Sequence, residues 1–393
     1  MSKPKLRFPE FKDLWNNYKI EDMFDRVGTP VDLDDAQTYR EIGIRSHGKG
    51  IFHKEETTAS EIGNKRVFWV EPNCFVVNIV FAWERAVAKT TEDENGMIAS
   101  HRFPMYKPKK DVVDLDYITE YFITKRGQNV LMLASPGGAG RNKTLGQNEF
   151  AKSVVKLPSI PEQQKIADFL STIDTVIEKQ KATVEVWEER KKGVMQKLFS
   201  QEVRFKADDG SEFPDWEEKK LGDDVQFING RAYKQDELLN SGKYLVLRVG
   251  NLFTNDSYYY SDLELDNDKY IENGDLIYAW SATFGPRIYY GEKCIYHYHI
   301  WKLKFDENII SKIFLNYYLL YDVEKIKSQR TGGTMVHITK NAMEHRELQF
   351  PCLAEQQKIA DCLSTLDDVI EKQKATLAAW EELKKGLLQQ MFV

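Results

Sequence analysis

A 42-residue segment occurs twice in this chain. Residues 158–199 and residues 351–392 align at an offset of 193 positions, and 28 of the 42 residues are identical. The segments that precede the two copies share almost no sequence with each other. Two like segments that each follow an unlike one predict a molecule with two different recognition domains joined by a repeated element.

Both copies have the heptad spacing of a coiled coil. Apolar residues recur alternately four and three positions apart over about four heptads, with Glu and Lys at the flanking positions. The predicted seam consists of Ile166, Leu170, Ile173, Ile177, Val184 and Trp187 in the first copy and Ile359, Leu363, Leu366, Ile370, Leu377 and Trp380 in the second. About 38 helical residues, rising about 1.5 Å each, would form helices of roughly 57 Å.

Polar residues interrupt both seams at equivalent places. These are Gln180 and Gln373, and Lys191 and Lys384. Polar seam residues cost stability but fix register and partner choice. For the two lysines, the alternative is that they only extend toward water at a fraying helix end.

The two helices are expected to pair with each other as an antiparallel coiled coil. A globular segment separates the end of the first helix from the start of the second, which favours the antiparallel direction. The alternative is that each helix pairs with another chain and forms a homo-oligomer.

The whole chain shows the pattern domain–helix–domain–helix. Strand-like and helical runs mix without regular βα alternation, so each domain is expected to be α+β. Ala82-Trp83 is interpreted as the counterpart of Ala279-Trp280, and 117–123 as that of 314–320. This duplication predicts a pseudo-twofold, cyclic arrangement with the N-terminus near the end of the second helix. The predicted segments are a domain at 1–157, a helix at 158–199, a domain at 200–350 and a helix at 351–393.

Composition places the chain among ordinary soluble proteins. It has 42% hydrophobic and 30% charged residues, and no apolar run approaches the roughly 20 residues that span a bilayer. The four cysteines form no CxxC pair, which suggests reduced thiols in a cytoplasmic protein. The net charge of −6 argues mildly against non-specific coating of nucleic acid, although charge can be placed locally.

No catalytic motif is convincing. The stretch 137–144 resembles a phosphate-binding loop but has Asn142 where the glycine before the lysine is required. His297 and His299 would share a strand face without a third ligand nearby, so a solvated pair is favoured over a metal site. We therefore expect a chain that is not an enzyme by itself and binds no cofactor or metal.

Signals for DNA binding are local. Loops rich in Gly, Arg, Asn, Ser and His can present side chains to base edges and amides to phosphates. The acid-free stretch 101–110 is a plausible phosphate-binding face. Ordinary solvated loops are the alternative for each position, and core packing is favoured for Trp83 and Trp280. The candidate DNA-binding residues are Arg45, Ser46, His47, Lys49, Arg141, Asn142 and Lys143 in the first domain, and Arg231, Tyr233, Lys234, Arg248, Asn251, Ser281, Arg330, Thr334, His337 and Lys340 in the second.

The repeated helices carry a family resemblance. The specificity subunits of type I restriction–modification systems have similar segments. These are the run PEQQKIADFLSTIDTVIEKQKA, its near-copy, and the segment EFPDWEEKKLGD at the start of the second domain. The NGDLI…AW run at 273–280 is similar to theirs as well. The resemblance covers essentially the whole length, and the domains match in pattern only.

That resemblance implies a function in DNA recognition. Each domain would bind one half of a split, asymmetric site in double-stranded DNA, and the helix pair would set the spacing between the halves. The helices would also dock two modification subunits, which carry S-adenosylmethionine and methylate adenine. Restriction subunits driven by ATP and Mg²⁺ would join that core. No membrane partner is implied.

Two other classes of function stay open at this point. The first is a scaffold or adaptor that bridges two protein partners through the coiled coil without contacting DNA, which the acidic balance slightly favours. The second is a single-chain enzyme, which would need a cofactor or metal motif that the sequence does not show.

Overall fold

The computed structural model describes residues 4–137, 143–253, 255–281, 284–328 and 338–392. The chain divides into two compact units. Unit 1 comprises residues 1–181 and 375–393, and unit 2 comprises residues 182–374. Both boundaries fall inside long helices, so each unit contains a part of each helix.

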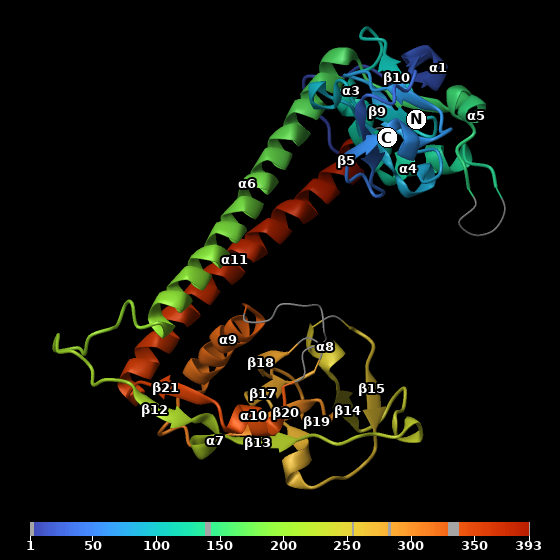
Figure 1. Ribbon diagram of the computed structural model, residues 1–393. Helices are drawn as coiled ribbons and strands as arrows, with labels where there is room; N and C mark the ends of the chain where they lie inside the picture. Colours follow the sequence, from blue (N-terminus) through green and yellow to red (C-terminus); the bar gives the residue numbers. More distant parts are fainter. Residues whose placement is uncertain (1–3, 138–142, 254, 282–283, 329–337, 393) are drawn as a thin grey trace. The chain divides into compact units, whose positions relative to one another are not determined.

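The two repeated segments form the long helices α6 (Ile160–Phe199) and α11 (Leu353–Met391), green and red in Figure 1. In unit 1, Lys384 contacts Asp174 at 2.7 Å and Lys181 contacts Glu381 at 3.9 Å. As the residue number rises along α6 it falls along α11, so the two helices are antiparallel there. In unit 2 the pairs Lys191–Asp367 and Glu188–Lys374 show the same direction.

The predicted seam residues are mostly buried. Ile166, Leu170, Ile173 and Ile177 belong to the core of unit 1, where Leu377 and Trp380 pack against them. In unit 2, Ile359 and Leu363 belong to the core and Leu366 packs against it. Val184 and Ile370 are also buried, and Trp187 is half-buried. Lys191 and Lys384 are only about one-fifth exposed and form ion pairs, so neither lies in open solvent at a fraying end.

Unit 1 begins with short strands and ends its globular part at the start of α6. Its strands are β1 (Asn16–Lys19), β2 (Phe24–Val27), β3 (Thr29–Pro30), β4 (Thr38–Ile44), β5 (Ile51–Thr58), β6 (Val67–Trp69), β7 (Phe75–Val77), β8 (Val87–Lys89), β9 (Ile98–Ser100), β10 (Met105–Pro108) and β11 (Val154–Leu157). Its short helices are α1 (Ile20–Met23), α2 (Ala59–Ile62), η1 (Ala82–Glu84), η2 (Glu92–Glu94), α3 (Leu115–Ile123), α4 (Lys125–Leu133) and α5 (Gln147–Lys152).

Unit 2 has the same kind of mixed composition. Its strands are β12 (Glu217–Lys220), β13 (Gln226–Asn229), β14 (Tyr244–Leu247), β15 (Tyr259–Ser261), β16 (Tyr270–Ile271), β17 (Leu276–Ala279), β18 (Gly285–Ile288), β19 (Cys294–Tyr296), β20 (Ile300–Lys304) and β21 (Glu347–Phe350). Its short helices are α7 (Leu221–Asp224), η3 (Gln235–Glu237), α8 (Val249–Phe253), η4 (Asn267–Lys269), α9 (Lys312–Ser328) and α10 (Lys340–Glu344).

The two units share a sheet of the same topology. In unit 1 the order is β2-β10-β7-β8, and in unit 2 it is β13-β20-β17-β18. A two-stranded pair accompanies each sheet, β1-β11 in unit 1 and β12-β21 in unit 2. Each unit then adds a sheet of its own, β3-β6-β9-β4-β5 or β15-β14-β19-β16. The prediction of two α+β domains of similar fold is confirmed.

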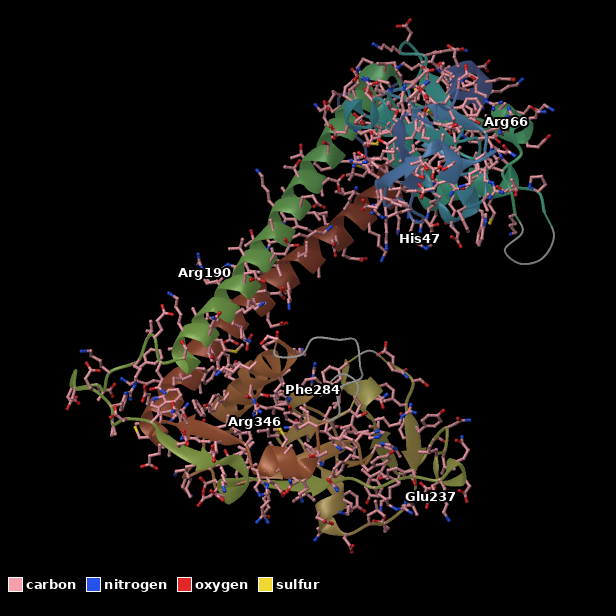
Figure 2. All side chains as sticks on the ribbon, viewed as in Figure 1. His47, Arg66, Arg190, Glu237, Phe284 and Arg346 are labelled. Atoms are coloured by element: carbon pink, nitrogen blue, oxygen red, sulfur yellow. The ribbon has the colours of Figure 1, made fainter. Side chains whose placement is uncertain are left out.

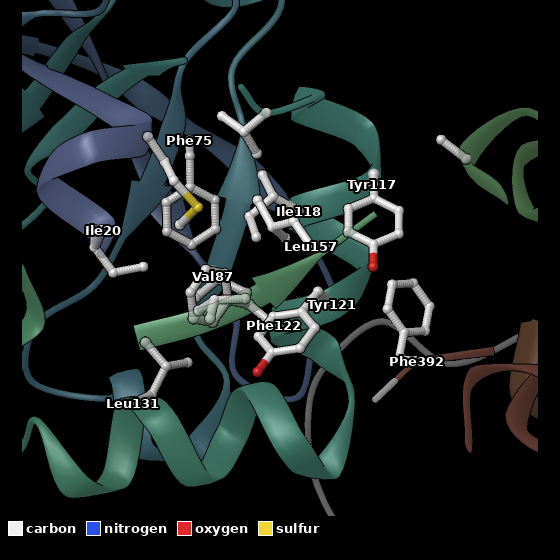
Figure 3. Close-up of a cluster of buried hydrophobic side chains, with 14 of the residues drawn as sticks. Ile20, Phe75, Val87, Tyr117, Ile118, Tyr121, Phe122, Leu131, Leu157 and Phe392 are labelled. Carbon is white, nitrogen blue, oxygen red and sulfur yellow. The ribbon is translucent and has the colours of Figure 1, made fainter. Parts of the chain in front are cut away.

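Aromatic side chains fix the C-terminal end of each long helix in a core. In unit 1 the ring of Phe392 lies 5.0 Å from that of Tyr117 and 6.1 Å from that of Tyr121, both on α3 (Figure 3). In unit 2 the ring of Phe199 stacks on that of Tyr318 at 4.9 Å, on α9. Phe199 and Phe392 are equivalent positions of the repeat, so each unit anchors one helix end in the same way.

The N-terminal segment returns to the end of α11. The Leu6 N–H donates to the Gln390 carbonyl at 3.0 Å, within unit 1. In unit 2 the Val203 N–H donates to the Lys197 carbonyl at 3.2 Å, where the chain is continuous. The cyclic arrangement predicted from the duplication is therefore present. The equivalent hydrogen bond joins the first and last segments of the chain in unit 1 and two neighbouring segments in unit 2.

The Glu-Gln pair of each EQQKIA segment fastens the helix start to its own unit. Glu162 is 1% exposed and accepts two hydrogen bonds from Arg7 at 2.7 and 2.8 Å. Glu355 is fully buried and accepts from Arg204 in the same way at 3.1 and 2.8 Å. A buried carboxylate needs such a paired cation, which explains why both copies keep this glutamate.

The neighbouring glutamine binds main-chain groups. Gln163 accepts from the Asp114 N–H at 2.9 Å and donates to the Val112 and Pro158 carbonyls. Gln356 makes the same three bonds, to the Ser311 N–H and to the Ile309 and Pro351 carbonyls. The two amides thus satisfy backbone groups just before α3 and α9, which would otherwise be buried without partners.

One predicted correspondence is wrong. Ile79 donates its N–H to the Arg102 carbonyl and accepts from Leu145, whereas Trp280 donates to His299 and accepts from Ile338. The equivalent of Trp280 is therefore Ile79, while Trp83 lies in η1. The shared Ala-Trp dipeptide arose in two different structural places.

Among the described residues, no helix is long and apolar enough to cross a membrane.

Candidate nucleic-acid interface

The same four-residue turn precedes the second strand of the shared sheet in both units. In unit 1 the Phe103 N–H donates to the Ser100 carbonyl at 2.8 Å, and in unit 2 the Ile300 N–H donates to the His297 carbonyl at 3.0 Å. The central residues of these turns are His101-Arg102 and Tyr298-His299. Because β10 and β20 run antiparallel to their neighbours, each turn lies at the edge where the neighbouring strands end.

The main-chain carbonyl of an arginine accepts a hydrogen bond from each turn. The His101 N–H donates to the Arg66 carbonyl at 2.9 Å, and the Tyr298 N–H donates to the Arg231 carbonyl at 3.1 Å. Arg66 precedes β6 and Arg231 follows β13, so the two arginines come from different connections. They nevertheless occupy equivalent places beside the turn.

In unit 1 the turn is cationic. The side chains of Arg26, Arg66 and Arg102 are exposed, and none forms an ion pair with any residue in the described ranges. Arg26 and His101 line a groove of about 290 Å³ together with Phe68 and Phe103. Figure 2 shows Arg66 at the periphery of unit 1. Unpaired guanidinium groups at such an edge can bind phosphate oxygens.

The hairpin loop between β4 and β5 contacts η1 and the residue after it. The His47 N–H donates to the Glu84 carbonyl at 2.7 Å and the Gly48 N–H to the Arg85 carbonyl at 2.9 Å. His47 has φ of 65° and Gly48 of 69°, and a side chain on Gly48 would approach Ile123 within 2.8 Å. The loop therefore depends on a glycine that can adopt the left-handed region and lies close to α3.

The predicted residues of this hairpin differ in availability. His47 and Lys49 are exposed, and no ion pair of either is present in the part of the chain described. Ser46 donates to the Glu84 carboxylate at 2.9 Å. Arg45 lies 4.8 Å over the Phe52 ring and donates to the Ile51 carbonyl. His47 and Lys49 are thus presented to solvent, while Arg45 and Ser46 support the loop.

Lys143 also lies against η1. Its Nζ lies 5.8 Å over the Trp83 ring, and the indole N–H of Trp83 donates to the Val80 carbonyl at 3.2 Å. Gln128 of α4 donates to the Trp83 carbonyl at 3.0 Å. The other two candidates of this loop, Arg141 and Asn142, lie outside the described residues.

In unit 2 the equivalent edge is aromatic. The Tyr298 ring lies 4.0 Å from the His299 ring and 4.4 Å from the His297 ring. His299 in turn contacts Trp280 at 4.9 Å, and Trp280 stacks on the buried Trp301 at 5.9 Å. Trp280 also donates its indole N–H to the Tyr298 carbonyl at 2.8 Å. The exposed Tyr298 is therefore supported by a continuous set of rings.

His297 is not a solvated residue. Its pKa is lowered to about 4, mainly by burial and also by the neighbouring His299 and Arg248. It is half-buried against the Tyr233 ring at 6.4 Å. The prediction of a solvated histidine pair is wrong for His297, because aromatic packing covers it. No group of three potential metal ligands occurs among the residues described.

Arg231 and its neighbours are partly committed within the unit. The Arg231 guanidinium contacts Glu237 at 2.7 Å and lies 5.3 Å over the Tyr233 ring. Tyr233 donates to the Tyr296 carbonyl at 3.3 Å, and Lys234 is exposed. The structure therefore brings these three predicted residues together with the turn at 297–300.

Arg248 and Asn251 shape a second loop. Asn251 accepts from the Arg248 N–H at 3.1 Å and donates to the Asn255 and Ser257 carbonyls. The Arg248 guanidinium lies 4.3 Å over the Tyr259 ring and donates to the Ser257 carbonyl. Arg248 also acts on the pKa of His297, which places it near the aromatic edge.

The remaining candidates of unit 2 are dispersed. Ser281 is buried, with 8% of its surface exposed. Lys340 begins α10 and pairs with Glu344 at 3.5 Å. Arg330, Thr334 and His337 lie outside the described residues.

Sequence inspection missed Arg66, Arg102 and Tyr298 as individual candidates. Arg102 and His101 fall in the acid-free stretch 101–110, which was the available signal. Elsewhere in that stretch, Lys107 donates to the Pro72 carbonyl at 2.7 Å and Lys109 contacts Asp25 at 3.5 Å. Within the described ranges, Arg102 in the first turn of the stretch and Lys110 at its end are exposed cations without an ion pair.

Comparison with known proteins gives a consistent family match. The model of the type I restriction modification DNA specificity domain matches twice, over residues 12–186 and 214–379. The MjaX specificity subunit of Methanocaldococcus jannaschii is 25% identical over 296 residues, which cover 72% of this chain and 68% of that protein. The MjaVIII specificity subunit of the same organism is 29% identical over 198 residues, covering 49% of this chain and 46% of that protein.

Solved structures show a similar fold. A chain of a type I R-M system, studied for its complex assembly and conformational transition, has a TM-score of 0.63 at 16% identity and covers 98% of both chains. The S subunit of a type I restriction-modification system from M. genitalium has a TM-score of 0.54 at 16% identity, covering 100% of this chain and 99% of that one. At this identity the likeness concerns the fold alone.

Proposed function

Because this chain belongs to the family of type I restriction–modification DNA specificity subunits, we propose that each unit binds one half of a split DNA site. In each unit the contacts come from one edge of the shared sheet, which carries the turn 100–103 in unit 1 and the turn 297–300 in unit 2. The observation that carries this assignment is the recurrence of that turn in both units, with different side chains in an equivalent backbone. A shared frame with different side chains suits the recognition of two different sequences.

In unit 1 the hairpin residues His47 and Lys49 and the residue Lys143 approach DNA together with the turn. In unit 2, Arg231, Tyr233 and Lys234 do so. The candidates Arg45 and Arg248 act mainly through the loops that they hold. We assign no catalytic step to this chain.

The helices α6 and α11 set the number of unread base pairs between the two half-sites. Their repeated surfaces also dock two modification subunits, one for each copy of the repeat. Those subunits supply S-adenosylmethionine and transfer a methyl group to adenine, which they extract from the duplex. Restriction subunits that use ATP and Mg²⁺ complete the assembly, which would work in the cytoplasm.

Methylome sequencing tests this proposal directly. A host that produces the chain with its modification subunit should carry adenine methylation at one bipartite sequence. Replacement of residues 1–157 by the corresponding domain of another specificity subunit should change one half of that sequence and leave the other half unchanged. A change in both halves, or in neither, would contradict the assignment of one half-site to each unit.

Variants of the hairpin give a finer test. Lys49→Gln should weaken binding of the modification complex to its site, since the exposed cation would lose a phosphate contact. Lys12→Gln is the matched control, because Lys12 is also exposed and has no ion pair within the described ranges. Equal affinities of the two variants in a gel-shift titration would remove the hairpin from the interface.

A further inference from the structure

We propose that the two units contact DNA through different chemistry at the same turn. Unit 1 binds phosphates with Arg66 and Arg102, whereas unit 2 contacts bases with Tyr298 and His299 and binds no phosphate at this turn. The inference rests on the proposed DNA-binding function and extends it. At this turn, it assigns the salt dependence of binding to unit 1 and short-range recognition to unit 2.

The equivalence of the two turns comes from four matching backbone bonds. Each turn closes with an i to i+3 bond, and its first central residue donates to an arginine carbonyl, Arg66 or Arg231. The second central residue, Arg102 or His299, accepts from the N–H of a residue just past the end of the neighbouring strand, Ile79 or Trp280. The carbonyl of Ile79 or Trp280 then accepts from the N–H of Leu145 or Ile338, which lies just before the last short helix of its unit. The side chains therefore project from the same place in both units.

The electrostatic character of this place differs between the units. In unit 1, Arg66 and Arg102 are exposed and unpaired within the described part of the chain, and Arg26 and His101 line the adjoining groove. A guanidinium group without an acidic partner retains its full charge for a phosphate. Each such contact releases counterions from DNA and steepens the salt dependence of binding.

In unit 2 a paired arginine and a histidine take the places of Arg66 and Arg102, and the nearby Arg248 lies over the Tyr259 ring and donates to the Ser257 carbonyl. Arg231, the equivalent of Arg66, is paired with Glu237, which Figure 2 shows at the edge of unit 2. His297 is neutral near pH 7 because burial lowers its pKa to about 4. Lys234 is exposed nearby, but Asp236 and Glu237 come two and three positions after it. Tyr298, which is 38% exposed, presents an aromatic surface with no formal charge.

Salt titration of DNA binding separates the two kinds of contact. The full chain, purified with its modification subunit, is titrated with a duplex that contains the methylated bipartite site over a range of salt concentrations. The double variant R66Q/R102Q should reduce the log–log salt slope by about 2, because each lost phosphate contact removes about 0.9. The variant Y298A/H299A should weaken binding by roughly tenfold, as expected for the loss of an aromatic contact, with the slope unchanged.

The conservative variant R66K/R102K distinguishes charge from structure. Lysine also neutralises a phosphate, so this variant should restore the wild-type slope. Thermal unfolding of all variants checks that each one is folded. An unchanged slope in folded R66Q/R102Q, or an equal loss of slope in Y298A/H299A, would overturn the proposal. Failure of the proposed function itself would look different, since the wild-type complex would then bind a scrambled duplex as tightly as its own site.

Discussion

Lys384 on α11 contacts Asp174 on α6 at 2.7 Å, and its Nζ also lies 3.5 Å from the carboxylate of Glu120 on α3. The repeat-related Lys191 contacts Asp367 at 2.6 Å in unit 2. There the position of Glu120 is taken by Tyr317, which donates to Asp367 at 2.5 Å. The two units therefore place the same ion pair in different surroundings, a carboxylate in one and a phenol in the other.

Glu120 should make the stability of unit 1 depend on pH. Burial raises the pKa of Glu120, nearby Lys384 lowers it, and Asp174 raises it again, with a net upward direction. A carboxyl group whose folded pKa is raised contributes stability below its unfolded pKa of about 4.3 and loses that contribution as pH rises through its folded pKa. The unfolding free energy of Glu120→Gln minus that of the wild type should therefore increase as pH rises from 4 toward 8. Urea unfolding monitored by fluorescence measures this difference. The exposed Glu149→Gln is the control, and equal pH profiles of the two variants would contradict the prediction.

The buried glutamate at the start of α11 should be important for unit 2. Glu355 accepts hydrogen bonds from Arg204 and from the Trp216 indole N–H at 3.1 Å, and it is fully buried. Glu355→Gln removes the buried counter-charge of Arg204, which keeps only the exposed Asp215 at 3.7 Å, and should cost about 3 kcal/mol of unfolding free energy. Glu178→Gln, at an exposed ion pair with Lys181, should cost less than about 1 kcal/mol. Similar losses of unfolding free energy in both variants would show that the buried ion pair contributes no more to stability than the exposed one.

Gly230 should be required for the DNA-binding edge of unit 2. A Cβ at this position would lie 2.4 Å from the Tyr296 carbonyl and 2.5 Å from the His297 carbonyl, so the backbone would have to shift. Gly230→Ala should displace the turn at 297–300 and weaken binding to one half-site by at least roughly tenfold, as expected for a misplaced recognition element. Gly250→Ala is the control, since its nearest neighbour would be Asn255 at 3.4 Å. Normal methylation of the bipartite site by the Gly230→Ala complex would refute the prediction.

The glycines near the ends of the repeats should be replaceable with a gain in stability. Gly193 and Gly386 lie inside α6 and α11, and an added Cβ would meet no atom within 3.9 Å at either position. Alanine in place of glycine favours a helix interior by about 0.8–1.0 kcal/mol. Each Gly→Ala variant should therefore raise the unfolding midpoint in urea. A loss of stability would show that these positions are occupied by something other than solvent.

The long helices were predictable because their pattern is local and repeated. The a/d spacing from Ile166 to Trp187 identifies the buried face before any partner is known. The same periodicity marks α3 and α9, whose aromatic residues Tyr117 and Tyr318 then enter the cores. What periodicity alone could not specify is the role of Gln163, since its partners Val112 and Asp114 lie in another part of the chain.

The candidate interface was only partly predictable. His47 and Lys49 belong to a loop with a recognisable composition, and the structure exposes both. Arg66 lies 35 positions before His101, and their contact is a backbone bond that leaves no trace in side-chain identity. The misleading Ala82-Trp83 and Ala279-Trp280 similarity shows the opposite case, in which equal residues occupy different structural places.

The division of the chain has a consequence for its synthesis. Unit 2 is formed by the uninterrupted stretch 182–374, whereas unit 1 takes the segment 375–393 from the far end of the sequence. Translation delivers that segment only after all of unit 2 has been made, so the aromatic pocket of Tyr117 and Tyr121 waits for Phe392 until then. Although domains generally fold from the N-terminal side during synthesis, here the unit translated first is the last to be completed.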